Sequence, residues 1–137
     1  MTETRNRPHY IGAPEFFHLD LLCRVINDAF GEYGYGTFLV GSSLQRRDFR
    51  DVDVRFIMAD VEFDRFFPEV AGASAGCWSR CSAWSLVCGA ISEWLAKRSG
   101  LPIDFQIQRM TEANAEFPGE RNALGVFRSA KRDEARR

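Results

Sequence analysis

The stretch TFLVGSSLQRRDFRDVDVRF, residues 37–56, decides which fold this sequence predicts. It opens with an apolar run, Phe38-Leu39-Val40, that ends at Gly41-Ser42-Ser43. It closes with an alternation of acidic and apolar residues that begins at Asp51. Such alternation is typical of a β-strand, in which successive side chains point to opposite faces. We therefore expect strands over residues 37–40 and 51–58, with one or two helical turns in residues 42–47.

The second of these strands would carry two carboxylates on one face. Asp51 and Asp53 share that face with Arg55, whereas the other face is apolar and can pack on a core. Two neighbouring carboxylates repel each other, and one pKa rises unless a cation lies between them. We interpret the acidic face as uncompensated by the protein itself. A divalent metal ion with oxygen ligands is then the natural cation.

The composition describes one soluble domain that spans residues 1–137. The chain is 45% hydrophobic with 12 Phe and 3 Trp, which is enough for one core. Its 18 basic and 19 acidic residues give a net charge of −1, so no overall field attracts nucleic acid. No apolar run is long enough to span a membrane, and residues 1–10 lack the apolar segment of a secretory signal. We expect a cytoplasmic protein without membrane association.

Helical spacing of apolar residues predicts four helices in the rest of the chain. Two are long, starting at Gly12-Ala13-Pro14-Glu15 and at about Ser79; two are short, over residues 61–67 with Asp60 as the cap and over residues 111–117. The segment GEYGYG, residues 31–36, has the wrong spacing for a dinucleotide fingerprint and is interpreted as a turn. Residues 1–11 and about 128–137 are expected to be flexible, with residues 121–137 a fraying helix or a tail.

A third strand carries a third acid. The segment LPIDFQIQ, residues 101–108, alternates cleanly, so Asp104 shares a polar face with Gln106 and Gln108. Aspartate is a poor strand former, so acids at the centres of strands are costly unless a function needs them. Asp104 therefore joins Asp51 and Asp53 as a candidate site residue.

The end of the first strand has the features of a phosphate-binding corner. A strand that runs into Gly-Ser and then into a helix start presents backbone N–H groups and a hydroxyl, which suit phosphate oxygens. Gly41, Ser42 and Ser43 are therefore candidate phosphate-binding residues. Three arginines in the following loop, Arg46, Arg47 and Arg50, would add positive charge beside this corner. The chain has no G-K-[ST], which excludes a P-loop.

Taken in order, Leu39-Val40-Gly41-Ser42, Asp51-Val52-Asp53-Val54 and Ile103-Asp104-Phe105 resemble the motifs of the DNA polymerase β-like nucleotidyltransferase superfamily, minimal single-domain type. The resemblance covers about residues 37–108. It implies an α+β fold, with a small mixed β-sheet and helices packed on one face. It also implies that Asp51 and Asp53 bind two magnesium ions, which manganese can replace, and that Asp104 completes this catalytic and metal site. Gly41, Ser42 and Ser43 would be nucleotide-binding residues, with Gly41 and Ser42 holding the triphosphate. Arg46, Arg47 and Arg50 are then candidates for contacts to the triphosphate, Arg47 among the nucleotide-binding residues.

The function that follows is transfer of a nucleoside monophosphate from a nucleoside triphosphate, ATP or another, to an acceptor hydroxyl, with release of pyrophosphate. Two metal ions would clamp the attacking and leaving oxygens, and Asp104 would ligate one ion or take the acceptor proton. The acceptor stays open between a protein, a small molecule and an RNA 3′ end. A homodimer or a partner protein could supply its site. Two alternatives remain: a nucleotide- and metal-binding module without turnover, and an antitoxin-like protein-interaction partner.

Overall fold

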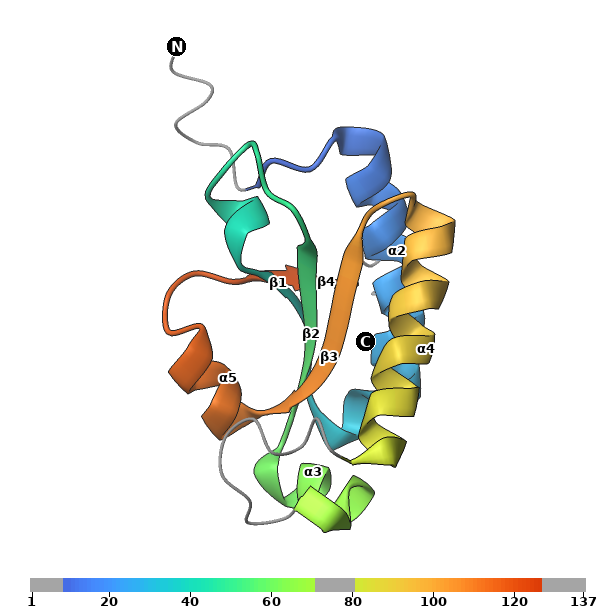
Figure 1. The fold of residues 1–137 in the computed structure, drawn as a ribbon, viewed down its shortest axis with the longest axis vertical. Coiled ribbons are helices and arrows are strands. Elements are labelled where there is room, and N and C mark those ends of the chain that lie inside the picture. The colour runs from blue at the N-terminus through green and yellow to red at the C-terminus, as the bar shows by residue number, and fades with distance from the viewer. Residues whose placement is uncertain (1–8, 71–80, 127–137) are drawn as a thin grey trace, which may run out of the picture.

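The computed structural model describes residues 9–70 and 81–126 (Figure 1). Four α-helices and four strands make up most of this part, and three short 3-10 helices join them. In chain order the elements are α2 (Ala13–Phe30), η1 (Gly31–Tyr33), β1 (Gly34–Val40), η2 (Ser42–Leu44), β2 (Val52–Met58), α3 (Asp60–Phe66), η3 (Pro68–Val70), α4 (Ser82–Ser99), β3 (Ile103–Arg109), α5 (Met110–Glu116) and β4 (Asn122–Leu124). No helix in the described ranges is long and apolar enough to cross a membrane.

The four strands form one mixed sheet in the order β3-β2-β1-β4. Strand β1 pairs antiparallel with both β2 and β4, whereas β2 and β3 are parallel. A parallel pair needs a long crossover, and α3 and α4 lie in this one. In the β2–β3 ladder Asp53 lies opposite Asp104, and in the β1–β2 ladder Val40 lies opposite Asp53. The register therefore brings the end of β1 and the two acids together.

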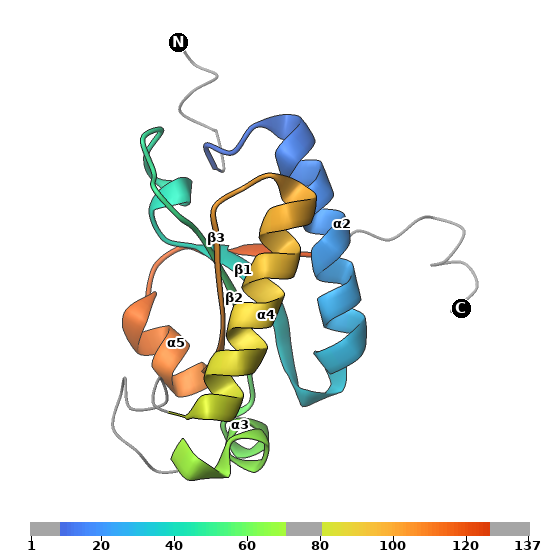
Figure 2. The same cartoon turned by 45° about the vertical axis from the view of Figure 1, so that its right-hand side comes forward.

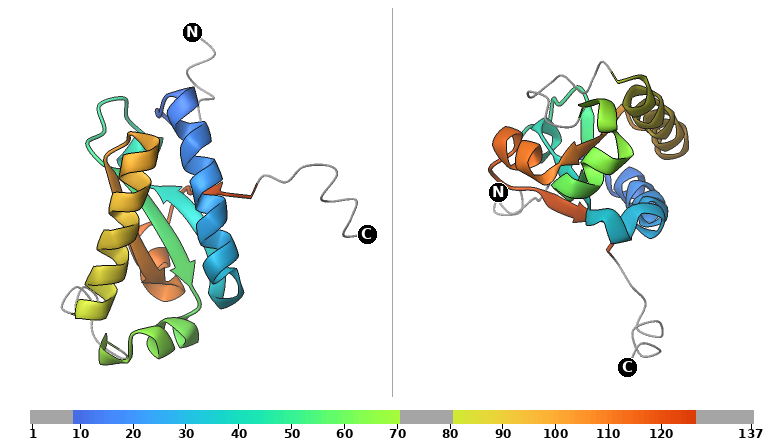
Figure 3. Two further views of the ribbon diagram at one scale, coloured as in Figure 1. Left: turned by 90° about the vertical axis from the view of Figure 1, so that its right-hand side faces the viewer. Right: turned by 90° about the horizontal axis from the view of Figure 1, so that it is seen from below.

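The long helices α2 and α4 lie side by side on one face of the sheet (Figures 2 and 3). The alternating apolar residues of the strands point toward these helices and form the core with them, as predicted. The fully buried core residues include Leu19, Cys23, Val54, Phe56, Leu95, Phe105 and Ile107. The short helix α5 lies against the opposite face (Figure 1). The predicted α+β class with a small mixed sheet is confirmed.

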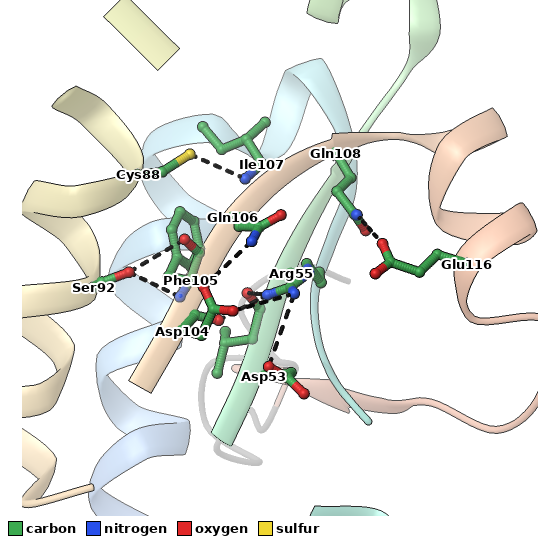
Figure 4. Close-up of polar contacts among 11 residues, drawn as sticks. Asp53, Arg55, Cys88, Ser92, Asp104, Phe105, Gln106, Ile107, Gln108 and Glu116 are labelled. Carbon is green, nitrogen blue, oxygen red and sulfur yellow. Dashed lines mark hydrogen bonds and ion pairs between the residues drawn. The ribbon is translucent and has the colours of Figure 1, made fainter. Parts of the chain in front are cut away.

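Side chains of α4 cover the backbone of β3, which is an edge strand of the sheet. Ser92 Oγ accepts a hydrogen bond from Phe105 N at 2.8 Å, and Trp84 Nε1 donates to the carbonyl of Ile107 at 2.9 Å (Figure 4 shows the Ser92 contact). Exposed strand edges invite pairing with other chains, so bonds of this kind close the edge. They also fix β3, and with it Asp104, relative to α4.

Strand β4 was missed by the sequence prediction, which treated residues 121–137 as a helix or a tail. Asn27 of α2 holds it in place: Asn27 Nδ2 donates to the carbonyl of Leu124 at 2.8 Å, and Asn27 Oδ1 accepts from Thr37 Oγ1 at 2.7 Å. The Gly125 N–H, just after β4, donates to Asp20 Oδ1 at 2.7 Å. The strand thus forms through contacts to distant parts of the chain. Residues 127–137 lie outside the described part.

Three further predictions need correction. The segment at residues 31–36 is not all turn, because β1 already begins at Gly34, where a side chain would collide with the backbone of β2. Asp60 does not cap α3: Ala59 is the N-cap, and the Asp60 carboxylate accepts from the Thr111 N–H at 3.2 Å. Residues 9–11 are packed rather than flexible, since Ile11 is buried and Tyr10 N donates to the Ser43 carbonyl at 2.8 Å. Residues 1–8 lie outside the described part, as does the predicted start of α4 at Ser79.

Candidate functional site

The corner after β1 is shaped by a glycine that lies against Asp53. Gly41 has φ +83° and ψ −155°, a conformation that is essentially restricted to glycine. A β-carbon at residue 41 would overlap Asp53 Oδ2 and lie 3.1 Å from Asp53 Cγ. The close approach is therefore possible only without a side chain at position 41. It brings the predicted phosphate-binding corner into contact with the predicted metal ligand.

Asp53 and Asp104 lie side by side on the face of the sheet away from α2 and α4. They are register partners on parallel strands, so their side chains point in the same direction. The Asp53 side chain is 21% exposed and the Asp104 side chain is 43% exposed. The predicted pairing of acids from two strands on one polar face is thus present, although the sequence did not specify which residues lie opposite each other.

Arg55 lies between these two acids (Figure 4). Its Nη2 is 3.9 Å from Asp53 Oδ1 and 3.6 Å from Asp104 Oδ2, and its side chain is only 4% exposed. The interpretation of the acidic face as uncompensated was therefore wrong, because the arginine on that same face supplies a positive charge. The signal was available in the sequence, since Arg55 follows Asp53 at a spacing of two residues in the same strand.

The backbone of two strands holds the guanidinium of Arg55 in place. Arg55 Nη1 donates to the Asp104 carbonyl at 2.8 Å and to the Val54 carbonyl at 3.2 Å. The ring of Phe117, just after α5, lies 5.5 Å from the guanidinium carbon and covers it. Arg55 Nε is buried without a hydrogen-bond partner in the described part of the chain. Because the guanidinium of Arg55 is buried and hydrogen-bonded to the backbone, its positive charge is held in one place.

The electrostatic environment of Asp53 opposes its ionisation. Burial raises the pKa of Asp53, Arg55 lowers it, and the charges of Asp104, Asp51 and Glu116 raise it; the net shift is upward. The attraction of Arg55 thus offsets only part of the cost of burial and repulsion. A further cation beside Asp53 would therefore stabilise its ionised form.

Asp51 is exposed and lies one residue before β2 begins. Asp51 therefore lies just outside the sheet, next to the end of β2 that carries Asp53. Within residues 9–70 and 81–126, no three acidic, histidine or cysteine side chains are gathered closely enough to form a ready metal site. Asp53 and Asp104 are brought together, and Asp51 is their neighbour along the chain and not a third member of a compact cluster.

The remaining predicted site residues differ in accessibility. Ser42 is partly exposed at the start of η2, whereas Ser43 is fully buried and its hydroxyl has no partner in the described part of the chain. The Ser43 hydroxyl is thus not presented to solvent in this conformation. The three loop arginines, Arg46, Arg47 and Arg50, are exposed. Arg46 Nε lies 3.8 Å from Asp48 Oδ1. Arg47 and Arg50 have no ion pair with an acid of residues 9–70 or 81–126, and their exposure leaves them accessible to an anionic ligand.

A polar contact from α5 completes this face of the sheet. Gln108 of β3 is buried, and its Nε2 donates to Glu116 Oε1 at 2.7 Å (Figure 4). Glu116 also acts on Asp53 through its charge. Neither residue was among the sequence candidates, because their proximity depends on how α5 folds back onto the sheet. The acidic face is thus limited by α5 at one end and by the Gly41 corner at the other.

A shallow hollow of about 270 Å³ lies elsewhere, lined by Tyr33, Glu62, Arg65 and Phe66. Tyr33 precedes β1 and Gly41 follows it, so the hollow and the acidic face are at opposite ends of this strand. Its two charged side chains pair with each other, with Arg65 Nη1 3.7 Å from Glu62 Oε1. The candidate residues Gly41, Asp53 and Asp104 meet at the acidic face, and none of the candidates lines this hollow.

Comparisons of the chain with protein-family models, with curated proteins and with solved structures found no match. The functional argument therefore depends on the residues of the acidic face and of the Gly41 corner.

Proposed function

We propose that this chain is a nucleotidyltransferase, which moves a nucleoside monophosphate from a nucleoside triphosphate to an acceptor hydroxyl. The acceptor oxygen would attack the α-phosphorus, the bond to the β-phosphate oxygen would break, and pyrophosphate would leave. The observation that carries the proposal is the contact of Gly41 with Asp53. It joins a Gly-Ser corner suited to phosphate with a half-buried carboxylate whose pKa is raised.

The chain offers a separate group for each part of the substrate. The Gly41-Ser42 corner would bind triphosphate oxygens, and the exposed arginines Arg47 and Arg50 are near enough in sequence to add charge. Asp104, the more exposed of the two strand acids, would accept a hydrogen bond from the acceptor hydroxyl. Positioning and charge neutralisation contribute most of the catalysis in phosphoryl transfer, so this division of roles suits the chemistry.

The residues fit one divalent ion better than two. Asp53 Oδ2 lies at the Gly41 corner, and Asp51 is exposed beside it along the chain, so these two acids would hold the ion. Magnesium, or manganese in its place, would neutralise the charge on the triphosphate and on the leaving pyrophosphate. The other oxygen of Asp53 is close to Arg55, as is Asp104, which leaves little room for a second ion between them.

A second candidate is a nucleotide-binding module without turnover. Arg55 favours it, because a buried arginine that already pairs with Asp53 and Asp104 lowers the charge available for binding metal. Such a module would bind nucleotide and magnesium at the same corner and release no pyrophosphate. Either protein would work in the cytoplasm.

Pyrophosphate release tests the proposal. Each of the four ribonucleoside triphosphates would be incubated with magnesium and the wild-type chain, with a cell extract as the source of acceptor. We expect release with at least one nucleotide, and its loss in the Asp51→Asn/Asp53→Asn double variant. Asp28→Asn is the matched control, because Asp28 is an exposed acid on α2, outside the site. Silence of the wild type with every nucleotide, together with a nucleotide-dependent rise in Tm, would favour the binding module instead.

A further inference from the structure

We infer that Arg55 is the resident cation of the acidic face: it takes the place between Asp53 and Asp104 where a second metal ion would otherwise bind. This inference rests on the proposed function, which identifies the acidic face as the site that binds metal and nucleotide. Asp104 then holds the arginine instead of ligating a metal ion, as the resemblance implied, and keeps its proposed role as acceptor of a hydrogen bond from the acceptor hydroxyl. It also limits divalent metal to the side of Asp53 that faces Gly41.

The first argument is the arrangement of charges around the guanidinium. Arg55 Nη2 is 3.6 Å from Asp104 Oδ2 and 3.9 Å from Asp53 Oδ1, so one nitrogen serves both carboxylates. Magnesium binds oxygen ligands at about 2.0–2.1 Å. An ion that bridged the same two oxygens would have to share the space between them with Nη2. It would also be repelled by a like charge in a poorly solvated place.

The second argument is that Arg55 cannot easily leave. Its Nη1 donates to the carbonyls of Asp104 at 2.8 Å and of Val54 at 3.2 Å, which belong to the backbones of β3 and β2. The ring of Phe117 covers the guanidinium, and the side chain is 4% exposed. Removing the head group from this position would break both backbone bonds and leave two carboxylates without their cation. A metal ion that approached the space between Asp53 and Asp104 would therefore find the guanidinium of Arg55 still in place.

The third argument is that both oxygens of Asp104 already have partners, whereas one oxygen of Asp53 points elsewhere. Asp104 Oδ2 is near Arg55, and Asp104 Oδ1 accepts from Gln106 Nε2 at 3.4 Å. In Asp53, Oδ1 is the oxygen near Arg55, and Oδ2 is the oxygen nearest Gly41. The Asp53 carboxylate thus has one oxygen toward the arginine and one toward the phosphate-binding corner. The second oxygen is therefore the one that we expect to share an ion with Asp51, which is exposed two residues earlier in the chain.

The test measures manganese binding to the full chain without nucleotide, from the electron paramagnetic resonance signal of free Mn²⁺. Five proteins are compared: wild type, Asp51→Asn, Asp104→Asn, Arg55→Gln and Arg55→Gln/Asp104→Asn. We expect wild type to bind one ion, Asp51→Asn to weaken binding about tenfold or more, and Asp104→Asn to change the Kd less than about twofold. Arg55→Gln should gain a second ion, or bind about tenfold more tightly, and Asp104→Asn in that background should remove the gain.

Two results would overturn the inference: a loss of about tenfold or more when Asp104→Asn is made in wild type, or an Arg55→Gln protein that gains nothing. A sixth protein, Arg55→Lys, keeps the positive charge and should gain no second manganese ion. If Arg55→Gln does not fold, the comparison of Asp51→Asn with Asp104→Asn still decides the matter. If wild type binds no manganese, the proposed metal requirement fails; a site gained in Arg55→Gln that depends on Asp104 would still support the role of Arg55.

Discussion

Gly41 lies so close to Asp53 that residue 41 has no room for a side chain: a β-carbon there would overlap Asp53 Oδ2. The contact couples the end of β1 to the centre of the acidic face. Because Gly41 also has φ +83°, two separate restrictions require glycine at this position.

The first prediction concerns this contact. Gly41→Ala should destabilise the protein by about 1–3 kcal/mol from the backbone conformation alone, with a further cost from displacing Asp53. The matched control is Gly89→Ala in α4, where a β-carbon meets nothing within 4 Å and helix propensity should raise stability by about 0.5–1 kcal/mol. Urea unfolding measures both. Equal effects of the two substitutions would contradict the importance of the Gly41–Asp53 contact.

The second prediction concerns pH. In the folded chain the pKa of Asp53 is raised, chiefly by burial, so the folded state binds this proton more tightly than the unfolded state does. The stability contributed by Asp53 is then greatest below its unfolded-state pKa of about 3.9 and falls as pH rises through the raised pKa. Asp53→Asn removes this loss because the amide does not ionise. We expect the Tm of Asp53→Asn to exceed that of wild type at pH 7, by a margin that shrinks toward pH 4.

That measurement is made in EDTA, so that no bound metal stabilises the wild type. Asp28→Asn, at an exposed position on α2, controls for the general effect of losing one negative charge. A margin that stays constant with pH, or that grows toward pH 4, would show that burial does not raise the pKa of Asp53.

A third prediction tests the pair formed by Arg55 and Asp104. Asp104→Asn should destabilise wild type by about 1–2 kcal/mol, less than for a fully buried pair, because Asp104 is 43% exposed and Asp53 remains near the arginine. The same substitution should cost clearly less in an Arg55→Gln background, where the partner is gone. Additive effects in this double-mutant cycle would mean that the two side chains do not interact.

Much of the strand structure could be predicted from local sequence. Polar and apolar residues alternate around Asp53 and around Asp104, and this alternation alone predicts two strands. The turn at Gly41 is predicted by a glycine at the end of an apolar run. These signals also identified the face on which both acids lie. The register that sets Asp53 opposite Asp104 is not local, and only the packed sheet shows it.

The position of Arg55 could not be predicted in the same way. Alternation places it on the acidic face, but an arginine on a strand usually extends into solvent. Its burial depends on Phe117 and on the carbonyl of Asp104, which lie far along the chain and meet it only after β3 and α5 have folded. Strand β4 was missed for a related reason, since three residues, Asn122–Leu124, are too few for a periodic signal.

A fourth prediction addresses β4 through Asn27, which bonds both Leu124 and Thr37. Asn27→Ala would leave the buried hydroxyl of Thr37 and the carbonyl of Leu124 without this partner, at a cost of about 1–3 kcal/mol. Hydrogen exchange at residues 122–124 should accelerate more than exchange in β2. Exchange that accelerates equally in both strands would contradict the role of Asn27 as the local anchor of β4.

Binding of nucleotide at the Gly41 corner is the central claim, and calorimetric titration of each ribonucleoside triphosphate tests it most directly. With magnesium present, we predict that at least one nucleotide binds wild type and Asp28→Asn with a Kd below about 1 mM. EDTA or Asp53→Asn should weaken this binding about tenfold or more. No binding by wild type, or equal binding by wild type and Asp53→Asn, would contradict the claim.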